Sequence, residues 1–385
     1  MPHQKIQAYR APIWLPGGHL QTIYANLFIR VPAVAYRRER QELPDGDFLD
    51  FDWVDGTAGA LKDSSQYLLE GHSDPLRTKV RVESYALKDS DPLRTKVRVE
   101  SYALKDSDPL RTKVRVESYA PVVVLFHGLE GSADSHYARD LMATVKARRW
   151  HGVVAHFRGC SGEDNRLPRA YFAGDSEDIE TILRHVKSRH PDAPVYAVGV
   201  SLGGNALLKW LGEQGDGARE LVECAAGVSA PVDLTAAGNA LDRGFNRRVY
   251  TARFLATLKK KALKKARQFP GTLDAEAIAA ATTFREFDTL VTARLHGFRD
   301  ADDYWFKVSS KPLLKSITVP TLVINAKNDP FLPASALPTA ADISPAITIE
   351  QPETGGHVSF PSGPFPGNMD WLPQRLMHHF DTRHR

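Results

Sequence analysis

The sequence has few cysteines and lacks the apolar segments that direct a chain to a membrane. Cys160 and Cys224 are the only cysteines among 385 residues, which is too few for a disulfide framework and fits a reducing compartment. The first ten residues do not show the basic-then-apolar pattern of a signal peptide. No run approaches the roughly 18 apolar residues of a membrane-spanning helix. We therefore expect a soluble, cytoplasmic protein.

The chain also lacks an excess of either charge. Its 50 basic and 46 acidic residues give a net charge of +4, which is too small for a chain of this length to indicate nucleic-acid binding. Hydrophobic residues make up 42% and charged residues 25%, and these proportions allow a sizeable core. Composition thus indicates a globular protein that does not bind nucleic acid.

The N-terminal unit, residues 1–54, is predicted to be an arm followed by a hairpin. Residues 11–24 combine two prolines, two glycines and two large aromatic residues, which predicts a turn-rich arm and a short helix from about Leu20. His19 is a candidate site residue, but we expect it to cap or pack on the arm. Residues 34–42 and 47–54 flank a Leu-Pro-Asp-Gly turn signal, which predicts an antiparallel hairpin at a sheet edge.

Residues 55–120 are interpreted as an insertion that contains three near-identical repeats. The 17 residues at 73–89 recur letter for letter at 90–106, and their first fourteen recur at 107–120. Functional repeats diverge at surface positions, whereas these copies do not, so we interpret them as a recent duplication or an artefact. Each copy could form an exposed strand, with any pairing antiparallel, and disorder is an equal alternative. A binding role for the repeat is the less favoured interpretation.

From residue 121 the pattern alternates between strands and helices. Residues 122–126 and 152–157 read as strands, and residues 135–150 and 175–189 read as helices. Acidic residues open the second helix and could suggest a metal, but acids in a first turn complement the helix dipole, and we prefer that reading. The alternation predicts an α/β fold with a mostly parallel sheet and helices on both faces. Its two halves are residues 121–232 and 311–385.

A serine lies in a tight turn between a strand and a helix of this core. Residues 198–205 read Val-Gly-Val-Ser-Leu-Gly-Gly-Asn, after the apolar run 195–198 and before the helix-like segment 206–211. Such a strand, glycine turn and helix form a nucleophile elbow, which lifts a serine hydroxyl above the edge of the sheet. Ser201 is therefore the predicted nucleophile.

Residues 233–310 interrupt the alternation with a mostly helical segment, which we predict to be a cap on the elbow side of the sheet. Lysines surround a single apolar stripe on its first long helix. Such a helix could touch an anionic membrane surface. We favour a solvated face that covers a pocket, because the net charge of the chain is weak. The stripe comprises Phe254, Leu255, Leu258, Ala262, Leu263, Ala266 and Phe269.

A serine nucleophile needs a base, and the base needs an acid that orients it. Asp329 follows a predicted strand that ends at Asn325, and His357 follows two glycines in a later loop. Proteins with a nucleophile elbow carry their catalytic residues in this order along the chain: serine, then acid, then histidine. Ser201, Asp329 and His357 are therefore predicted to be catalytic.

Several residues are rival candidates for these roles. Asp233 follows the preceding strand and could supply the acid, although we expect it to shape the junction with the cap. Cys160 could be a nucleophile, but no strand-turn-helix surrounds it, so we expect a packing residue. His378 and His379 lie on the last predicted helix, and we expect both at the surface.

Acyl transfer also requires donors for the negative charge that develops on the carbonyl oxygen. The loop His127–Gly131 follows a buried strand, and we predict the backbone N–H groups of Leu129 and Leu202 as the oxyanion hole. His127, Gly128 and Arg158 are predicted to contribute to substrate binding at the same rim. We expect the side chain of His127 to brace the loop and not to react.

These motifs together resemble the α/β-hydrolase superfamily, and within it the YheT-like serine esterase/hydrolase family, whose eukaryotic relatives include lipid-acting serine hydrolases. The resemblance covers nearly the whole chain and departs from the family at residues 55–120. It implies that the charge-relay residues are Ser201, Asp329 and His357. The matching segments are residues 14–22, 127–131, 157–163, 199–205, 295–298, 328–330 and 355–357.

The sequence therefore predicts a serine hydrolase that cleaves carboxylic esters through an acyl-enzyme, with no metal or organic cofactor. Its partner would be a small-molecule ester or a lipid-like substrate. One alternative is a lipid acylhydrolase or acyltransferase whose cap contacts a membrane. Another is a non-catalytic binding protein that keeps the fold, which the complete set of three residues disfavours. The sequence does not predict an oligomeric state.

Overall fold

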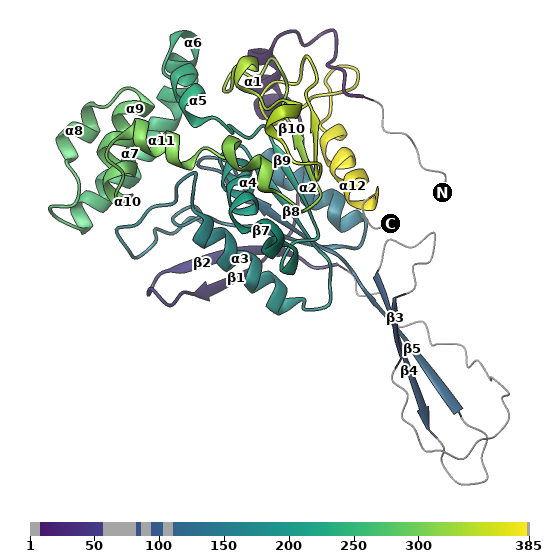
Figure 1. The fold of residues 1–385 in the computed structure, drawn as a ribbon. Coiled ribbons are helices and arrows are strands. Elements are labelled where there is room, and N and C mark those ends of the chain that lie inside the picture. The colour runs from purple at the N-terminus through teal and green to yellow at the C-terminus, as the bar shows by residue number, and fades with distance from the viewer. Residues whose placement is uncertain (1–7, 57–81, 86–93, 103–110, 383–385) are drawn as a thin grey trace.

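An eight-stranded β-sheet runs through the centre of the structure, a computed structural model that describes residues 8–56, 82–85, 94–102 and 111–382 (Figure 1). Six of its strands come from the alternating part of the chain and two from the N-terminal hairpin. The strands are β1 (Arg37–Glu42), β2 (Phe48–Val54), β6 (Val122–Phe126), β7 (His151–Ala155), β8 (Val195–Val200), β9 (Cys224–Val228), β10 (Thr321–Ile324) and β11 (Ile347–Glu350).

The sheet is mostly parallel, with one antiparallel edge. Its strand order is β1-β2-β7-β6-β8-β9-β10-β11. The pairs β1–β2 and β2–β7 are antiparallel, and every pair from β7 to β11 is parallel. The predicted α/β class, parallel sheet and edge hairpin are thus confirmed.

Helices cover both faces of the sheet because the central strands are apolar on both sides. Val122, Val124 and Phe126 of β6 pack with residues of α3 (Ser176–Arg189) and α4 (Leu202–Gln214). Val123 and Leu125 face the other way and pack with α2 (His136–Ala147) and α12 (Trp371–Thr382). This continuous apolar run therefore forms a strand between two helical layers, as expected for a strand buried on both faces.

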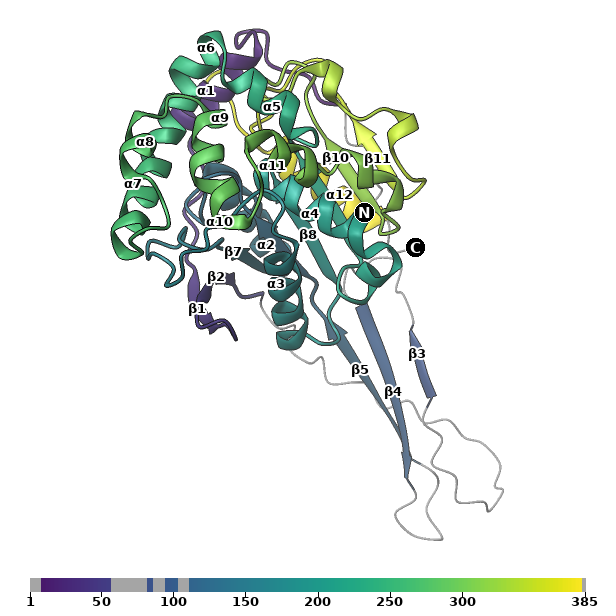
Figure 2. The same ribbon diagram turned by 60° about the vertical axis from the view of Figure 1, so that its left-hand side comes forward.

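The segment between β9 and β10 is helical and lies at one end of the sheet, where Figures 1 and 2 show its helices grouped together. Two π-helical turns interrupt it, at Arg247–Thr251 and Asp288–Ala293. The α-helices of this cap are α5 (Leu234–Leu241), α6 (Gly244–Asn246), α7 (Ala252–Gln268), α8 (Ala275–Ala280), α9 (Phe284–Phe287), α10 (Arg294–His296) and α11 (Ala301–Val308). The described residues also form 3₁₀ turns outside the cap helices, at Gly215–Glu220, Lys311–Ser316, Ala334–Ala336 and Ala340–Asp342.

The repeats contribute a second, separate sheet. Its strands are β3 (Val82–Tyr85), β4 (Arg94–Tyr102) and β5 (Arg111–Tyr119), and the order is β3-β4-β5 with antiparallel pairing. In both views this sheet lies apart from the eight-stranded one (Figures 1 and 2). The remaining residues of the predicted insertion, 57–81, 86–93 and 103–110, lie outside the described residues.

The last helix corrects one sequence expectation. His379 on α12 is 3% exposed, and its Nε2 lies 3.2 Å from Sγ of Cys224 and 3.2 Å from the carbonyl oxygen of Ala225. The prediction that His379 lies at the surface was wrong, because the apolar face of α12 includes this position. Throughout the described part of the chain, no helix combines the length and apolarity needed to cross a membrane.

Candidate active site

Ser201 lies in a strained turn between β8 and α4. Its backbone has φ 52° and ψ −119°, a conformation that costs free energy for any residue with a side chain. The glycines on either side make the turn possible. A Cβ on Gly199 would lie 2.5 Å from the carbonyl oxygen of Gly203, and a Cβ on Gly203 would lie 2.4 Å from that of Phe126. The turn is thus closed by contacts that only glycine permits.

The structure brings the three predicted catalytic residues into one line. Nε2 of His357 lies 2.9 Å from Oγ of Ser201, and Nδ1 of His357 lies 2.8 Å from Oδ2 of Asp329. Asp329 and His357 are 5% and 8% exposed, so the surrounding protein holds both side chains in place. The ring of Phe331 stacks on that of His357, with the centroids 4.0 Å apart. A serine, an imidazole and a carboxylate at these distances can activate the serine hydroxyl.

The N-terminal helix α1 (Gly18–Phe28) holds the loop of His357. Oγ1 of Thr22 accepts the backbone N–H of His357 at 2.9 Å. Oε1 of Gln21 accepts N–H groups from Gly355 and from the side chain of Asn328, each at 2.9 Å. We did not predict these contacts from the sequence. The available signal was a Gln-Thr pair inside a helix of mixed polarity, within a segment that resembles the family.

Leu129 and Leu202 both line the cavity that Ser201 and His357 reach. Leu202 is the first residue of α4, and N–H groups in a first helical turn have no partner within the helix. The N–H of Gly128 donates to the hydroxyl of Tyr137 at 2.8 Å, which leaves Leu129 as the next donor in the loop. A Cβ on Gly128 would lie 3.2 Å from Cβ of Ser201, so this glycine gives the loop its close approach to the nucleophile. The role of Leu129 and Leu202 as oxyanion donors stays a prediction.

His127 braces the loop, as expected, but it does not reach the cavity as the predicted substrate contact requires. It is fully buried, its Nδ1 lies 2.8 Å from the carbonyl oxygen of Gly128, and its Nε2 accepts the N–H of Phe157 at 3.1 Å. Burial lowers the pKa of His127 to about 3, which keeps the ring neutral. The predicted substrate contact of His127 is therefore corrected to bracing of the loop, because both ring nitrogens are already in use.

Arg158 lines the cavity, but its guanidinium group forms ion pairs with acidic side chains of the protein. Its Nε and Nη2 donate to both carboxylate oxygens of Asp178, each at 2.8 Å. Its Nη1 donates to Asp45 at 2.8 Å and to Asp47 at 3.0 Å. Asp178, one of the acids in the first turn of α3, is therefore an ion-pair partner of this arginine. Arg158 does not offer a free cation to an anionic substrate.

The rival residues have structural partners. Asp233 caps α5 by accepting the N–H of Ala236 at 2.9 Å, as expected for the junction with the cap. His19 lies 3.2 Å from the hydroxyl of Tyr250. Burial raises the pKa of Cys160 to about 11, so its thiol stays protonated and is a poor nucleophile. Among the residues that the structure describes, no group of three or more histidines, cysteines or acids is arranged to hold a metal ion.

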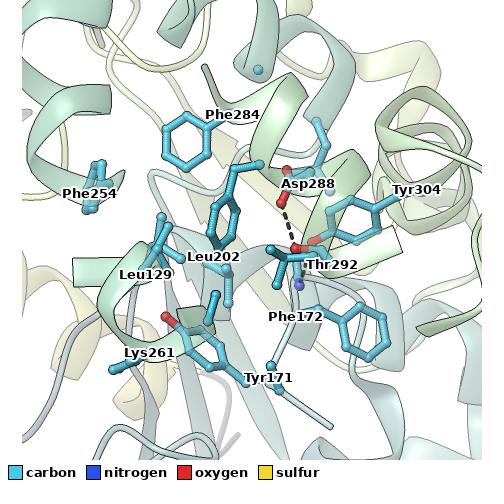
Figure 3. A pocket seen from close by; sticks show the side chains of 18 of the residues that line it. Leu129, Tyr171, Phe172, Leu202, Phe254, Lys261, Phe284, Asp288, Thr292 and Tyr304 are labelled. Carbon is cyan, nitrogen blue, oxygen red and sulfur yellow. Dashed lines mark hydrogen bonds between the residues drawn. The ribbon is translucent and has the colours of Figure 1, made fainter. Parts of the chain in front are cut away.

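A largely apolar cavity of about 160 Å³ lies between the core and the cap, next to Ser201 (Figure 3). Phe254, Phe284 and Tyr304 from the cap line it, together with Phe172 and Tyr171 from the core. Large aromatic side chains with few polar atoms favour an apolar ligand. The cavity is therefore suited to a hydrocarbon chain near the serine.

The basic helix α7 covers this cavity and binds the core through three of its five lysines. Lys261 donates to Oε1 of Glu130 at 2.7 Å. Lys265 donates to Oδ1 of Asn165 at 2.7 Å, and Lys264 pairs with Asp164. These three cations therefore serve contacts within the protein, which agrees with a helix that covers a pocket.

One acid in the cavity wall has no cationic partner in the described structure. Asp288 accepts Oγ1–H of Thr292 at 2.7 Å and Nε1–H of Trp305 at 2.8 Å, and Figure 3 shows the first of these bonds. Burial, more than the nearby charge of Asp242, raises the pKa of Asp288 to about 6. Asp288 was not predicted from the sequence, because it lies in a helical segment without a motif.

Comparison with known proteins identifies the family. Residues 121–364 match the sequence profile of the family described as "alpha/beta hydrolase fold". This match spans more than half of the chain and includes β6, the elbow and the loops of Asp329 and His357. The chain belongs to the α/β-hydrolase family.

Curated relatives connect this α/β-hydrolase to enzymes that act on esters and lipids. It is 36% identical to "Putative esterase YheT" of Escherichia coli K12 over 93% of this chain and 88% of that protein, which places it in the YheT-like family. It is 26% identical to human phospholipase ABHD3 over 95% and 76% of the two chains. It is also 26% identical to monoacylglycerol lipase of Saccharomyces cerevisiae over 62% and 55%. The fold and these relatives identify a hydrolase.

Proposed function

We propose that this α/β-hydrolase is a serine esterase that cleaves carboxylic esters. One observation carries the proposal: Ser201, His357 and Asp329 form a continuous hydrogen-bonded line at the wall of an apolar cavity. A serine held in a strained turn beside a buried imidazole has little other use in a stable protein. The family membership supports the same chemistry.

In the proposed reaction, Oγ–H of Ser201 donates its proton to Nε2 of His357 while Oγ attacks the ester carbonyl carbon. Asp329 accepts the Nδ1–H of His357 and stabilises the imidazolium. The N–H groups of Leu129 and Leu202 bind the carbonyl oxygen as it becomes negative. The imidazolium then protonates the leaving alcohol, which departs and leaves an acyl-serine.

Water completes the cycle. His357 removes a proton from water, the resulting hydroxide attacks the acyl carbon, and the proton returns to Oγ of Ser201 as the acid leaves. If an alcohol enters in place of water, the same steps transfer the acyl group. The acyltransferase alternative therefore differs only in the acceptor.

The lining of the cavity favours an ester with an apolar acyl chain. Phe172, Phe254 and Phe284 present hydrocarbon surface beside the serine, and burial of apolar surface contributes roughly 25 cal/mol per Å². Two relatives, a phospholipase and a monoacylglycerol lipase, are named for lipid substrates and support the same choice. A lipid ester is therefore the second candidate substrate, after a simple carboxylic ester.

A fluorophosphonate probe tests the proposed nucleophile. We expect the wild-type protein to be labelled and Ser201→Ala to lose labelling, together with at least about a 10⁴-fold loss of kcat/KM on a p-nitrophenyl ester. Cys160→Ala is the matched control for the rival nucleophile and should label as the wild type does. Equal labelling of the wild type and Ser201→Ala would exclude the proposed mechanism.

A series of p-nitrophenyl esters tests the substrate class. Because the cavity is apolar, kcat/KM should rise with acyl-chain length until the chain fills the cavity and then fall. A glycerol acceptor added to the same assay would reveal acyl transfer as a new ester product. A flat dependence on chain length would contradict the cavity as the acyl site.

A further inference from the structure

Helix α1 has its polarity reversed with respect to a normal surface helix. Gln21 and Thr22 are 1% and 5% exposed, whereas Leu20, Leu27 and Phe28 are 53%, 57% and 63% exposed. Helices that cover a core usually direct apolar residues inward and polar residues outward. The exposed residues follow helical spacing, so they form one apolar stripe that faces away from the protein.

The orientation of α1 is fixed by its polar face. Thr22 accepts the N–H of His357, and Gln21 accepts N–H groups from Gly355 and Asn328. Gly18 lies so close to Asn328 that a Cβ there would come within 1.9 Å of its carbonyl oxygen. Rotation of the helix to bury its leucines would break these contacts. The outward apolar stripe is therefore a consequence of how the His357 loop is held.

Other exposed apolar side chains gather around this stripe. Trp14 follows Ile13 and packs against Phe365, with ring centroids 5.5 Å apart. Phe245 of α6 packs against His19 at 4.5 Å, and α1 and α6 lie side by side in both views (Figures 1 and 2). Of the seven large hydrophobic residues that are exposed in the described structure, six thus lie on or beside α1. We call these six the α1 patch: Ile13, Leu20, Leu27, Phe28, Phe245 and Phe365.

The segments that carry the α1 patch contain cations and no acids. Residues 8–38, 243–273 and 355–369 include no aspartate or glutamate. Arg10, Arg30, Arg243 and Arg248 are exposed, and none forms an ion pair within the described residues. Large exposed apolar patches mark interaction sites. Exposed arginines on the same segments add attraction for a negatively charged surface.

We propose that the α1 patch docks the protein onto the surface of an anionic lipid bilayer. Exposed leucine and phenylalanine side chains, on segments that also carry exposed arginines, match the composition of surfaces that lie in a membrane interface. A second copy of the chain is a poorer occupant, because a two-fold contact would place the same arginines opposite one another. The docking surface is α1 and not the basic cap helix α7, because the apolar residues Phe254, Leu258 and Ala262 of α7 line the cavity and do not face outward.

This proposal concerns binding and does not depend on the proposed esterase activity. It can therefore be tested with the full-length protein and with vesicles alone. The wild type is mixed with vesicles of phosphatidylcholine, or of phosphatidylcholine with an equal amount of phosphatidylglycerol, and the bound fraction is measured by sedimentation. We expect binding to the anionic vesicles that weakens as salt is added.

Variants locate the surface. Leu27→Ser/Phe28→Ser should lower the affinity for anionic vesicles at least about ten-fold, since two exposed apolar side chains no longer enter the interface. Arg10→Gln/Arg30→Gln should weaken binding and reduce its salt dependence. Phe306→Ser is the matched control, because Phe306 is 78% exposed but lies on α11, outside the α1 patch. Substitutions at such exposed positions should leave the fold intact.

Three results would overturn the proposal. The first is a wild-type protein that does not sediment with anionic vesicles. The second is a Phe306→Ser variant that loses as much binding as Leu27→Ser/Phe28→Ser. The third is a protein that does not bind vesicles but forms a concentration-dependent dimer in gel filtration, which Leu27→Ser/Phe28→Ser abolishes. The α1 patch would then bind a second copy of the chain.

Discussion

At the scale of single residues, the carboxyl group of Asp288 has an unusual environment for an acid. It lies in the wall of the apolar cavity with two hydrogen-bond donors and no cation among the described residues. Burial raises its pKa to about 6, so the folded protein holds this proton more tightly than the unfolded chain does. An acid with a raised pKa stabilises the fold at low pH and loses that contribution as the pH rises.

The replacement Asp288→Asn tests this linkage. An unfolded aspartate titrates near 3.9, so the contribution of Asp288 is complete below about pH 4 and is lost through about pH 6. The free energy of unfolding of the wild type, relative to Asp288→Asn, should therefore fall by up to about 3 kcal/mol between pH 4 and pH 7. Urea unfolding at several pH values measures it. Asp216→Asn removes an exposed acid and is the control, and parallel curves for wild type and Asp288→Asn would contradict the expectation.

For residues within a motif, the sequence predicted which side chains lie together. Ser201, Asp329 and His357 follow recognisable strand ends and glycines, and the structure brings their side chains together. The prediction failed for Arg158, because the sequence does not reveal that its partners come from the hairpin turn and from α3. Contacts between distant segments depend on the complete fold.

At the scale of elements, an ion pair joins α7 to the loop that contains Leu129. Lys261 binds Glu130, which follows Leu129 and has a φ of 55°. The hydroxyl of Tyr171 donates to Oε1 of Glu130 and accepts its N–H. The position of the cap helix and the shape of the loop beside Ser201 are therefore coupled.

Replacing Lys261 with methionine should loosen this coupling while keeping the apolar stem of the side chain. We expect amide hydrogen exchange in α7 to accelerate about five- to thirty-fold, which corresponds to about 1–2 kcal/mol for a half-buried charged hydrogen bond. Lys260→Met is the matched control, because Lys260 is the exposed neighbour on the same helix. If both variants exchange at the same rate, the ion pair does not hold the cap.

Periodicity predicted the elements of the core better than those of the cap. The apolar run of β6 reflects a strand that is buried on both faces, as its pattern predicted. The alternation in β2 also predicted a strand, but both of its faces are buried, because Arg40 and Arg38 of the neighbouring strand cover Asp50 and Asp52. The cap was recognised as helical, but its two π-helical turns were not foreseen. Neither was the outward apolar face of α1, since hydrogen bonds to the His357 loop, and not hydrophobicity, determine the rotation of this helix.

At the scale of the whole molecule, the three described strands of the repeats form no backbone pairing with the main sheet. Strands β3, β4 and β5 pair only with one another in the described structure, although β5 precedes β6 directly in sequence. Identical copies at surface positions also indicate that no individual copy has a specialised role. The hydrolase core should therefore fold without the additional copies.

Deletion of residues 73–106 removes two copies and leaves the third as the connection to β6. We expect the midpoint of thermal unfolding to change by less than about 2 °C and the esterase activity to stay within about two-fold of the wild type. Calorimetry and the p-nitrophenyl ester assay measure these quantities. Loss of activity in a variant that still unfolds cooperatively would show that the repeat contributes to function.

The contacts of α1 also bear on how the enzyme can be shortened. The family match begins at residue 121, yet Thr22 and Gln21 hold the loop of His357 and the β1–β2 hairpin pairs with β7. A fragment trimmed to the matched region would keep the serine, the acid and the histidine but lose the support that aligns them. We therefore expect the smallest active unit to be discontinuous in sequence. It would need α1, the β1–β2 hairpin and the hydrolase core, whereas residues 73–106 between them could be removed.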